Sequence, residues 1–423
     1  MPPVASPMTS HDDTAGSSDQ RRQDRLRIVV PRYGSSVVGG AESAMRQLGL
    51  ALAARSWSVQ VWTTTAADEA TWTSGFPSGV ERDGPIEVRR FPVLMRRHPW
   101  VFRQLSHAAY HLPRHLRAEH LWSVEQGPWA PGLIRALRRA DPIPTLFSPY
   151  LFHPTLFGLP AAPHPRILCP AAHDEPALRL EVVRRAVLAT DALWFHSPEE
   201  RELLLATHPA AGRLPSECGV VGIEAPRDVD PHAFTVRHGI AGPYLYYGGR
   251  TTRGKGLADL LAAAELLHSH HPSTTLVLSG EAGDLRQAPW VHSVGRLDEH
   301  ERWEAIAGAA AVVVPGSLES LSLLALEAWA MGRPCLLNAA SPVLAGQSAR
   351  SGGGVTFTGA EELATHAARL VADPGLAATM GAAGRAWVAA TYGWDLAETR
   401  LRALLAAATP KNGWVPLADD RRL

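Results

Sequence analysis

The 423-residue chain is 46% hydrophobic and 19% charged, which excludes a mostly disordered protein and is enough to fill the interiors of two domains. Its 41 Lys and Arg residues balance its 41 Asp and Glu residues, so no overall positive field attracts nucleic acid, and we expect no nucleic-acid partner. The three cysteines lie far apart, which excludes a disulfide framework and a structural zinc site.

The first 24 residues are polar and contain no apolar block. We expect residues 1–24 to form a disordered leader and not a secretory signal. The longest apolar runs elsewhere are far shorter than the ~20 residues that a membrane-spanning helix needs. These features predict a cytoplasmic protein.

The first half of the chain alternates short β-branched runs with helical patterns. We expect strands at 26–31, 58–65, 86–91, 145–148, 166–170 and 192–196, and helices at 41–55, from 175 and from 198. Strands separated by helices predict a parallel sheet covered on both faces. Residues 25–225 are therefore expected to form one doubly wound, Rossmann-like α/β domain.

The segment 218–234 contains several Gly and Pro residues and marks the expected connection to a second unit. After it we expect strands at 244–248, 274–279, 291–294, 311–315 and 334–338, and helices at 255–268, 298–308, 320–331, 361–371, 375–392 and 394–408. Residues 226–393 are predicted to form a second Rossmann-like domain, and 394–423 a helix that crosses back to the first domain, followed by a polar tail. Because ligands bind beyond the carboxyl ends of parallel strands, we expect the functional residues in loops that face a cleft.

The most informative motif is Gly248-Gly249-Arg250-Thr251-Thr252-Arg253-Gly254-Lys255-Gly256, placed between a predicted strand and a predicted helix. Glycines allow close backbone approach, the helix N-terminus offers free N–H groups, and Arg250 and Lys255 add positive charge. The chain contains only one other lysine, which favours a specific role for the ammonium at 255. This arrangement suits a diphosphate; the alternative is a flexible turn with solvated cations.

A second motif is the acidic pair Glu319 and Glu327. Eight residues apart, the first is expected in a loop at the mouth of a helix and the second about two turns into it, with Leu321, Leu323, Leu324 and Leu326 facing the sheet. Carboxylates accept hydrogen bonds from vicinal hydroxyls, so the pair can hold sugar rings. The alternative is one acid favoured by the helix dipole and one surface acid.

Two weaker motifs precede these along the chain. Gly39-Gly40-Ala41-Glu42 occupies the first strand-to-helix turn, where backbone N–H groups can meet an anion; a plain tight turn explains it nearly as well. His173 follows a predicted strand and can bind a sugar hydroxyl or share in proton transfer. With 19 histidines in the chain, only its position favours that role over a surface residue.

Together these motifs resemble the large family of retaining, nucleotide-sugar-dependent glycosyltransferases with the GT-B fold (family four, glycosyl transferases group 1). The resemblance extends from about residue 26 to residue 394, with four motifs in the family's order. It implies two Rossmann-like domains facing across a cleft, the first (25–225) binding the acceptor and the second (226–393) the nucleotide sugar. It also implies Glu319 at the donor sugar, Glu327 at the ribose and the backbone after Glu319 at the phosphates. The expected catalytic residues are Arg250, Lys255, Glu319 and His173.

The donor site expected from the motifs and the resemblance also includes loops on both sides of the cleft. Backbone near Gly295, Arg296 and Leu297 is expected to meet the nucleobase. The full expected donor set is Gly39, Gly40, Gly249, Arg250, Lys255, Gly295, Arg296, Leu297, Glu319, Ser320, Leu321, Ser322 and Glu327. Residues 320–322 depart from the family, many of whose members carry glycines and an aromatic there, so the donor sugar stays open.

We expect neither a metal nor a cofactor. Arg250 and Lys255 can neutralise the charge of a departing diphosphate as a divalent ion otherwise would. Asp228-Val229-Asp230 spells the Asp-x-Asp metal motif of another glycosyltransferase fold, but it lies in the predicted connection and is interpreted as structural.

The acceptor side is less well marked. Gln126 and Trp129 border a Gly-Pro turn and are predicted to line it. Residues 89–122 carry seven arginines and a single acid among aromatic residues, which suits peripheral contact with an anionic membrane face and a lipid-linked acceptor. The alternative is a solvated basic helix face with inward aromatics.

The sequence thus predicts a metal-independent retaining glycosyltransferase that moves a hexose from a nucleoside diphosphate sugar to a glycan or lipid-linked acceptor. Three alternatives stay open: a sugar-nucleotide epimerase on the same fold, a phosphorylase on the same fold, and a catalytically silent subunit that binds nucleotide or a partner enzyme.

Overall fold

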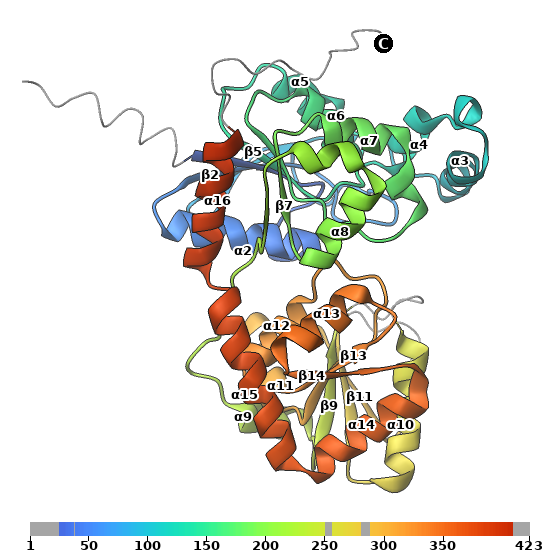
Figure 1. Ribbon diagram of the computed structural model, residues 1–423, viewed down its shortest axis with the longest axis vertical. Coiled ribbons are helices and arrows are strands. Elements are labelled where there is room, and N and C mark those ends of the chain that lie inside the picture. The colour runs from blue at the N-terminus through green and yellow to red at the C-terminus, as the bar shows by residue number, and fades with distance from the viewer. Residues whose placement is uncertain (1–24, 38, 250–255, 281–287, 409–423) are drawn as a thin grey trace, which may run out of the picture.

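The computed structural model describes residues 25–408 except for residue 38 and the segments 250–255 and 281–287. Figure 1 shows two α/β units, one above the other, each with a sheet between helices. The expected fold class, two doubly wound domains, is confirmed. Residues 225 and 226, where we place the domain boundary, lie between the last strand of the first sheet and the first helix of the second unit.

The first sheet has the order β3-β4-β2-β1-β5-β6-β7-β8. All neighbouring strands are parallel except β3 and β4, which form an antiparallel pair that the sequence did not predict. The central strand β1 is buried on both faces from Leu26 to Val29, and this includes Arg27, which donates to the Thr145 hydroxyl at 3.2 Å. The bounds are β1 (Arg25–Val29), β2 (Ser58–Thr64), β3 (Gly79–Asp83), β4 (Ile86–Phe91), β5 (Thr145–Phe147), β6 (Arg166–Leu168), β7 (Ala192–Phe195) and β8 (Ser216–Cys218).

Seven α-helices and three 3-10 turns are described around this sheet. The helix expected from residue 175 is wrong in its start, because Pro176 opens a 3-10 turn and the α-helix begins only at Glu181 after an extended Leu180. The bounds are α2 (Gly40–Ala54), α3 (Pro99–His111), η1 (Arg114–Leu116), α4 (Glu119–Gln126), α5 (Pro131–Leu137), α6 (His153–Ala161), η2 (Pro176–Arg179), α7 (Glu181–Leu188), α8 (Pro198–Thr207) and η3 (Pro209–Arg213).

The second sheet is wholly parallel in the order β11-β10-β9-β12-β13-β14. Its strands are β9 (Tyr244–Gly248), β10 (Thr275–Ser279), β11 (Val291–Gly295), β12 (Ala311–Val314), β13 (Cys335–Asn338) and β14 (Gly354–Phe357). Its helices are α9 (Pro231–His238), α10 (Leu257–His270), α11 (Glu299–Gly308), α12 (Leu323–Ala330), α13 (Pro342–Ser351), α14 (Gly359–Ala372) and α15 (Pro374–Thr391). The sequence had not predicted α13 and β14.

The last described helix, α16 (Trp394–Ala408), leaves the second unit and packs against the first. Leu401 and Leu404 are buried, and two polar contacts fix its start. The Arg55 guanidinium lies 2.7 Å from Asp395, and the Trp57 indole N–H donates to Glu398 at 3.0 Å. The chain therefore crosses between the units twice, once after β8 and once between α15 and α16, and the two crossings tether the units to each other.

Candidate functional site

A cavity of about 860 Å³ lies between the two units and is lined by both. On the side of the first unit its walls come from Gly34, Ser35, Val37 and Gly39, the first turns of α2, and the loops after β5, β6 and β7. The second unit contributes the loops after β9, β10, β11 and β12 and parts of α11 and α12. Every strand named here contributes its carboxyl end, where parallel sheets place their ligands.

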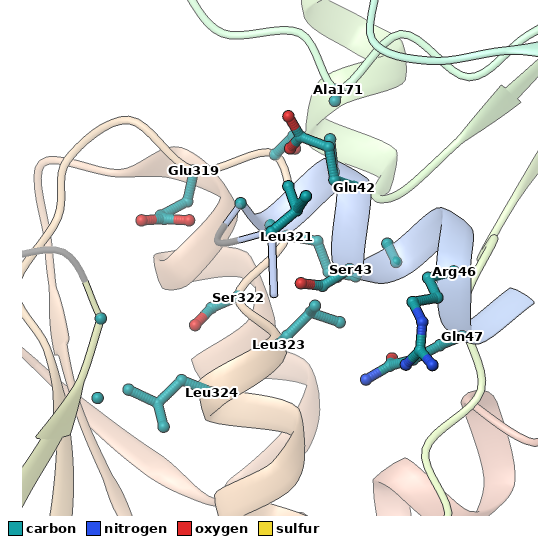
Figure 2. A pocket seen from close by; sticks show the side chains of 18 of the residues that line it. Glu42, Ser43, Arg46, Gln47, Ala171, Glu319, Leu321, Ser322, Leu323 and Leu324 are labelled. Carbon is teal, nitrogen blue, oxygen red and sulfur yellow. The ribbon is translucent and has the colours of Figure 1, made fainter. Parts of the chain in front are cut away.

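At the first strand-to-helix turn, the carboxylate of Glu42 occupies the space that a side chain at Gly39 would need. A Cβ on Gly39 would lie 2.2 Å from Glu42 Oε2. Glu42 is 7% exposed and bonds Arg32, whose Nη2 lies 2.7 Å from Glu42 and 2.9 Å from Glu69. Burial raises the pKa of Glu42, Arg32 opposes that rise, and Glu69 adds to it. Gly39, Gly40 and Glu42 all line the cavity, and Figure 2 shows the Glu42 side chain leaving α2 beside Ala171.

The loop after β6 brings His173 to the same cavity. Its side chain is half-buried, and among the described residues its Nδ1 is enclosed without a hydrogen-bond partner. Two neighbours restrain the loop. Ala171 has a φ of 52°, a left-handed conformation that costs a non-glycine residue energy, and Glu175 accepts a 2.8 Å hydrogen bond from the Tyr150 hydroxyl. An enclosed ring nitrogen without a hydrogen-bond partner, on a loop with restrained backbone, is typical of a position that binds a ligand.

Beneath this loop lies a buried cluster of Cys169, His196 and Glu200 that the sequence analysis missed. Glu200 accepts backbone N–H groups from Ala172 at 2.7 Å and His196 at 2.6 Å, so it ties the His173 loop to the start of α8. Burial alone would lower the pKa of His196, but Cys169 and Glu200 raise it well above its usual range. The only signal in the sequence is the Ser-x-x-Glu capping pattern of residues 197–200.

In the second unit, glycines bring backbone segments close together. Gly249 lines the cavity, and a Cβ on Gly280 would lie 2.2 Å from the Gly249 carbonyl. Gly256, at φ 71°, caps α10 and would place a Cβ 2.1 Å from the Pro315 carbonyl. Arg250 and Lys255, our principal candidates for binding phosphate, lie outside the described residues.

The acidic pair differs from the expectation in its local structure. α12 begins at Leu323 and not at Ser320, because Ser322 is the N-cap and its hydroxyl accepts the Ala325 N–H. Residues 319–322 therefore form a loop, and Glu319, Ser320, Leu321 and Ser322 all line the cavity. Of the four leucines expected to face the sheet, Leu326 is fully buried, and Leu321, Leu323 and Leu324 pack against the core and also line the cavity (Figure 2).

Glu327 also lines the cavity, but it is 2% exposed and forms an ion pair with Arg302 of α11. Burial raises the pKa of Glu327, and the adjacent Arg302 works against that rise. Arg302 is 25 residues away in sequence, and nothing in the motif pointed to it. The Glu327 carboxylate therefore lines the cavity while one of its oxygens is bound by Arg302.

Only two of the three residues predicted to meet the nucleobase lie at the cavity. Arg296 and Leu297 line the cavity, whereas Gly295 does not; at φ 70° it ends β11, and its carbonyl accepts the Gly280 N–H. Arg296 reaches across the cavity and donates to the Ser36 carbonyl at 3.0 Å. Within the described residues Arg296 forms no ion pair, so its charge is available to an anion.

Neither predicted acceptor residue lies at the cavity. Gln126 is 5% exposed, and its carbonyl accepts from Trp72 and Arg97 at the end of α4. Trp129 is held in a backbone bridge with Met95. The Gly-Pro turn between them packs into the first unit instead of facing the second, so this expectation finds no support in the geometry.

The connection between the units is structural, as interpreted from the sequence. Asp230 caps α9 by accepting the His232 N–H at 2.9 Å. Phe234, four residues later, is fully buried. Within the described residues, no helix is long and apolar enough to cross a membrane.

Comparisons with known proteins agree with this geometry. Residues 237–387 match the family model described as Glycosyl transferases group 1. The glycogen synthase of Mycobacterium tuberculosis (strain CDC 1551 / Oshkosh) is 30% identical over 205 residues, 44% of this chain and 47% of the relative. A GDP-mannose-dependent monoacylated alpha-(1-6)-phosphatidylinositol monomannoside mannosyltransferase of Corynebacterium glutamicum is 26% identical over 218 residues, 47% of this chain and 57% of the relative.

The chain thus spans about half the length of the curated relatives it matches. Among solved structures, the sucrose-phosphate synthase from Thermosynechococcus elongatus superposes with a TM-score of 0.65 at 20% identity and covers 90% of this chain and 99% of that one. Two doubly wound units with a shared cavity at their strand ends define a protein of the GT-B fold. Residues 237–387 thus match the Glycosyl transferases group 1 family, and the chain as a whole is similar to glycosyltransferases.

Proposed function

We propose that the protein is a retaining glycosyltransferase that moves a hexose from a nucleoside diphosphate sugar to a glycan or lipid-linked acceptor without bound metal. One observation carries the proposal: stretches around residues 39–42, 173, 249 and 319–327, far apart in the chain, all line one cavity of about 860 Å³. A cavity of this size suits a ligand as large as a nucleotide sugar. The match of residues 237–387 to the Glycosyl transferases group 1 family supports the same activity.

Charge supports a diphosphate on the side of the second unit. Cleavage of the bond between the anomeric carbon and the diphosphate leaves negative charge on the departing oxygen. Gly249 lines the cavity, and Gly256 adjoins Pro315, which precedes the lining residue Gly316. We assign Arg250 and Lys255, between these glycines, to the diphosphate, and Arg296 to its nucleoside side. Preorganised cations of this kind stabilise the leaving group in the transition state.

The acids and His173 suit hydroxyl groups. We assign Glu319 to the donor sugar and Glu327 to the ribose, because carboxylates accept hydrogen bonds from hydroxyls. His173, with its unpartnered Nδ1, is assigned to a sugar hydroxyl on the opposite wall. For retention, the acceptor oxygen bonds to the anomeric carbon on the leaving-group face while the bond to the diphosphate breaks, and the acceptor proton passes to the departing phosphate oxygen.

A binding screen followed by product analysis tests this function. UDP-glucose, ADP-glucose and GDP-mannose are compared by thermal shift, since a ligand at 100 times its Kd adds about 2.7 kcal/mol of stability. The stabilising donor is then incubated with glycan acceptors, and the configuration of the product is read by NMR. No stabilisation by any nucleotide sugar contradicts the donor site. An inverted anomer contradicts retention, and epimerised donor without transfer favours the epimerase.

We further propose that the surface around α3, η1 and α4 contacts an anionic membrane and presents a lipid-linked acceptor. Trp100 is 66% exposed, and Leu116 and Leu121 are similarly open, with the exposed cations Arg103 and Arg114 beside them in the chain. Exposed apolar side chains together with cations favour binding at an anionic interface. Other members of the basic stretch do not contribute: Arg90 is buried against Glu81 and Arg97 bonds backbone carbonyls.

Vesicle co-sedimentation tests the membrane contact. Binding to phosphatidylglycerol vesicles at low salt is expected to fall in Trp100→Ser and with added salt. Val236→Ser is the matched control, because Val236 is 68% exposed on α9 of the other unit. Equal sedimentation of the two variants, or none by the parent at low salt, removes the proposal.

A further inference from the structure

A second cavity, of about 680 Å³, lies in the second unit at the amino ends of its strands. It is therefore at the opposite edge of that sheet from the cavity described above, where the carboxyl ends meet. Its walls are the turn between α12 and β13, the end of α14 and one face of α15. Most of the α15 wall is alanine, so the walls are smooth and apolar.

Two guanidinium groups interrupt this apolar lining, Arg333 from the turn and Arg385 from α15. The two side chains lie near each other: Arg385 Nη2 is 2.9 Å from where a Cβ on Gly332, the residue before Arg333, would be, and Arg385 acts electrostatically on Arg333. No acid is among the lining residues, and within the described part of the chain neither arginine forms an ion pair. The adjoining Asp373 is engaged as the N-cap of α15, where it accepts the Leu376 N–H.

The two cations are thus left uncompensated. Arg333 Nε is enclosed without a hydrogen-bond partner among the described residues, although polar groups in such positions are usually paired. Burial lowers the pKa of Arg333, and the neighbouring Arg385 lowers it further, while Tyr244 opposes the change. Like charges held side by side over apolar walls are stabilised when an anion binds between them.

We propose that this cavity is a second ligand site, which binds a small organic anion with a phosphate or carboxylate between Arg333 and Arg385 and an apolar body against the alanines of α15. The pair of guanidiniums matches the oxygens of such an anion, and the volume is within the usual range for small-molecule sites. This site is independent of the proposed transferase function.

The site is joined to the donor cavity through α12. The carbonyl of Glu327, whose side chain lines the first cavity, accepts the N–H of Met331, which lines the second. The turn is tightly packed, since a Cβ on Gly381 of α15 would lie 1.8 Å from the Gly332 carbonyl. A ligand that shifts this turn therefore acts on the helix that carries Glu327, and we propose that the two sites are coupled. This coupling alone rests on the proposed donor site.

Calorimetric titration of the full chain with phenyl phosphate tests the site, with saturating UDP or GDP present to occupy the first cavity. One equivalent of phenyl phosphate is expected to bind. Phenol, which lacks the phosphate, and inorganic phosphate, which lacks the apolar ring, are expected to bind more weakly. Arg333→Gln and Arg385→Gln are each expected to raise the Kd about tenfold or more. Arg369→Gln, an exposed cation of α14 outside the lining, is the matched control.

Absence of binding, equal binding of phenol, or an unchanged Kd in both variants overturns the proposal. If the thermal melt shows that Arg333→Gln does not fold, the Kd of Arg385→Gln is the test, because Arg385 is exposed and its replacement should not disturb the fold. Coupling predicts that phenyl phosphate changes the Kd of the nucleotide about fivefold, and that the nucleotide changes the Kd of phenyl phosphate by the same factor. A nucleotide Kd that is identical with and without phenyl phosphate removes the coupling and leaves the site.

Discussion

Replacement of Arg302 by Met tests whether Glu327 is held in its cavity as a buried anion. Glu327 is 2% exposed, and the side chain of Arg302 is 28% exposed. Methionine keeps the apolar stem of arginine but removes the only partner of Glu327 that is assigned among the described residues. Breaking a buried ion pair from one side typically costs 3–5 kcal/mol. We expect about 3 kcal/mol, the lower end, because cavity water can reach the space vacated by a partly exposed side chain.

The dependence of this cost on pH follows from the pKa of Glu327. Loss of Arg302 raises that pKa further in the folded protein, since Arg302 is the group that lowers it. An acid with a raised folded pKa favours folding at low pH and loses that contribution as the pH rises through the folded pKa. The stability gap between parent and Arg302→Met is therefore expected to be widest near pH 8 and to narrow toward pH 5.

Urea unfolding followed by tryptophan fluorescence measures the effect, with equal m-values required across variants. The double variant Arg302→Met, Glu327→Gln is the control, because it removes the stranded charge and should recover most of the loss. Glu327→Gln alone should cost about 1 kcal/mol and raise the donor KM more than it lowers kcat. An Arg302→Met protein within about 0.5 kcal/mol of the parent at pH 8, inside the range of ordinary surface changes, would refute the buried anion.

Three further predictions use other parts of the molecule. Lys255→Ala is expected to melt like the parent but to lose transfer by a factor of several hundred, as for a lost transition-state donor of ~3 to 4 kcal/mol; near-parental turnover of the folded variant removes the phosphate assignment. Gly39→Ala places a methyl group 2.2 Å from Glu42 Oε2, so the Arg32–Glu42 pair must shift. We expect the free energy of unfolding in urea to fall by about 2 kcal/mol. Gly40→Ala is the control and should be near neutral, because a Cβ there has nothing within 4 Å. Burial lowers the pKa of His153 to about 4, so its contribution to stability is present above its unfolded pKa of about 6.5 and lost as the pH falls through 4; His153→Phe should flatten the fall in melting temperature between pH 6.5 and pH 4.

The sequence predicted the parts of the fold that one strand and its following helix determine. Residues 311–315 form a continuous apolar run and residues 26–31 are apolar apart from Arg27, so both runs are typical of the middle of a parallel sheet. β4 was predicted, but β3 and its antiparallel pairing with β4 were missed, because Gly79–Asp83 is polar and almost wholly exposed and its alternation carries no apolar signal. The late start of α12 was missed for a related reason: two serines flank Leu321, and the choice between helix and cap depends on tertiary contacts.

The candidate site was predictable to the extent that it follows strand ends. His173 and Glu319 each come within a few residues of a buried strand, and the carboxyl ends of parallel strands meet at one edge. Their partners come from other elements: Glu200 lies 28 residues from Ala172, which it binds, and Arg302 reaches Glu327 from another helix. Such pairs depend on the rotation of one helix against another, which no local pattern in a single sequence records.

These unpredicted partners change the charge that the cavity presents. From the motifs alone, Glu42, Glu319 and Glu327 would make a strongly acidic cleft, which repels a diphosphate. In the folded protein Arg302 pairs with Glu327, and Arg32 is shared between Glu42 and Glu69, so the paired acids present less charge than isolated carboxylates would. Arg296 lines the cavity without an ion pair among the described residues. We therefore expect Arg296 and the cations in the segment after Gly249 to attract a nucleotide, and substitutions of them to change donor affinity with a strong dependence on salt.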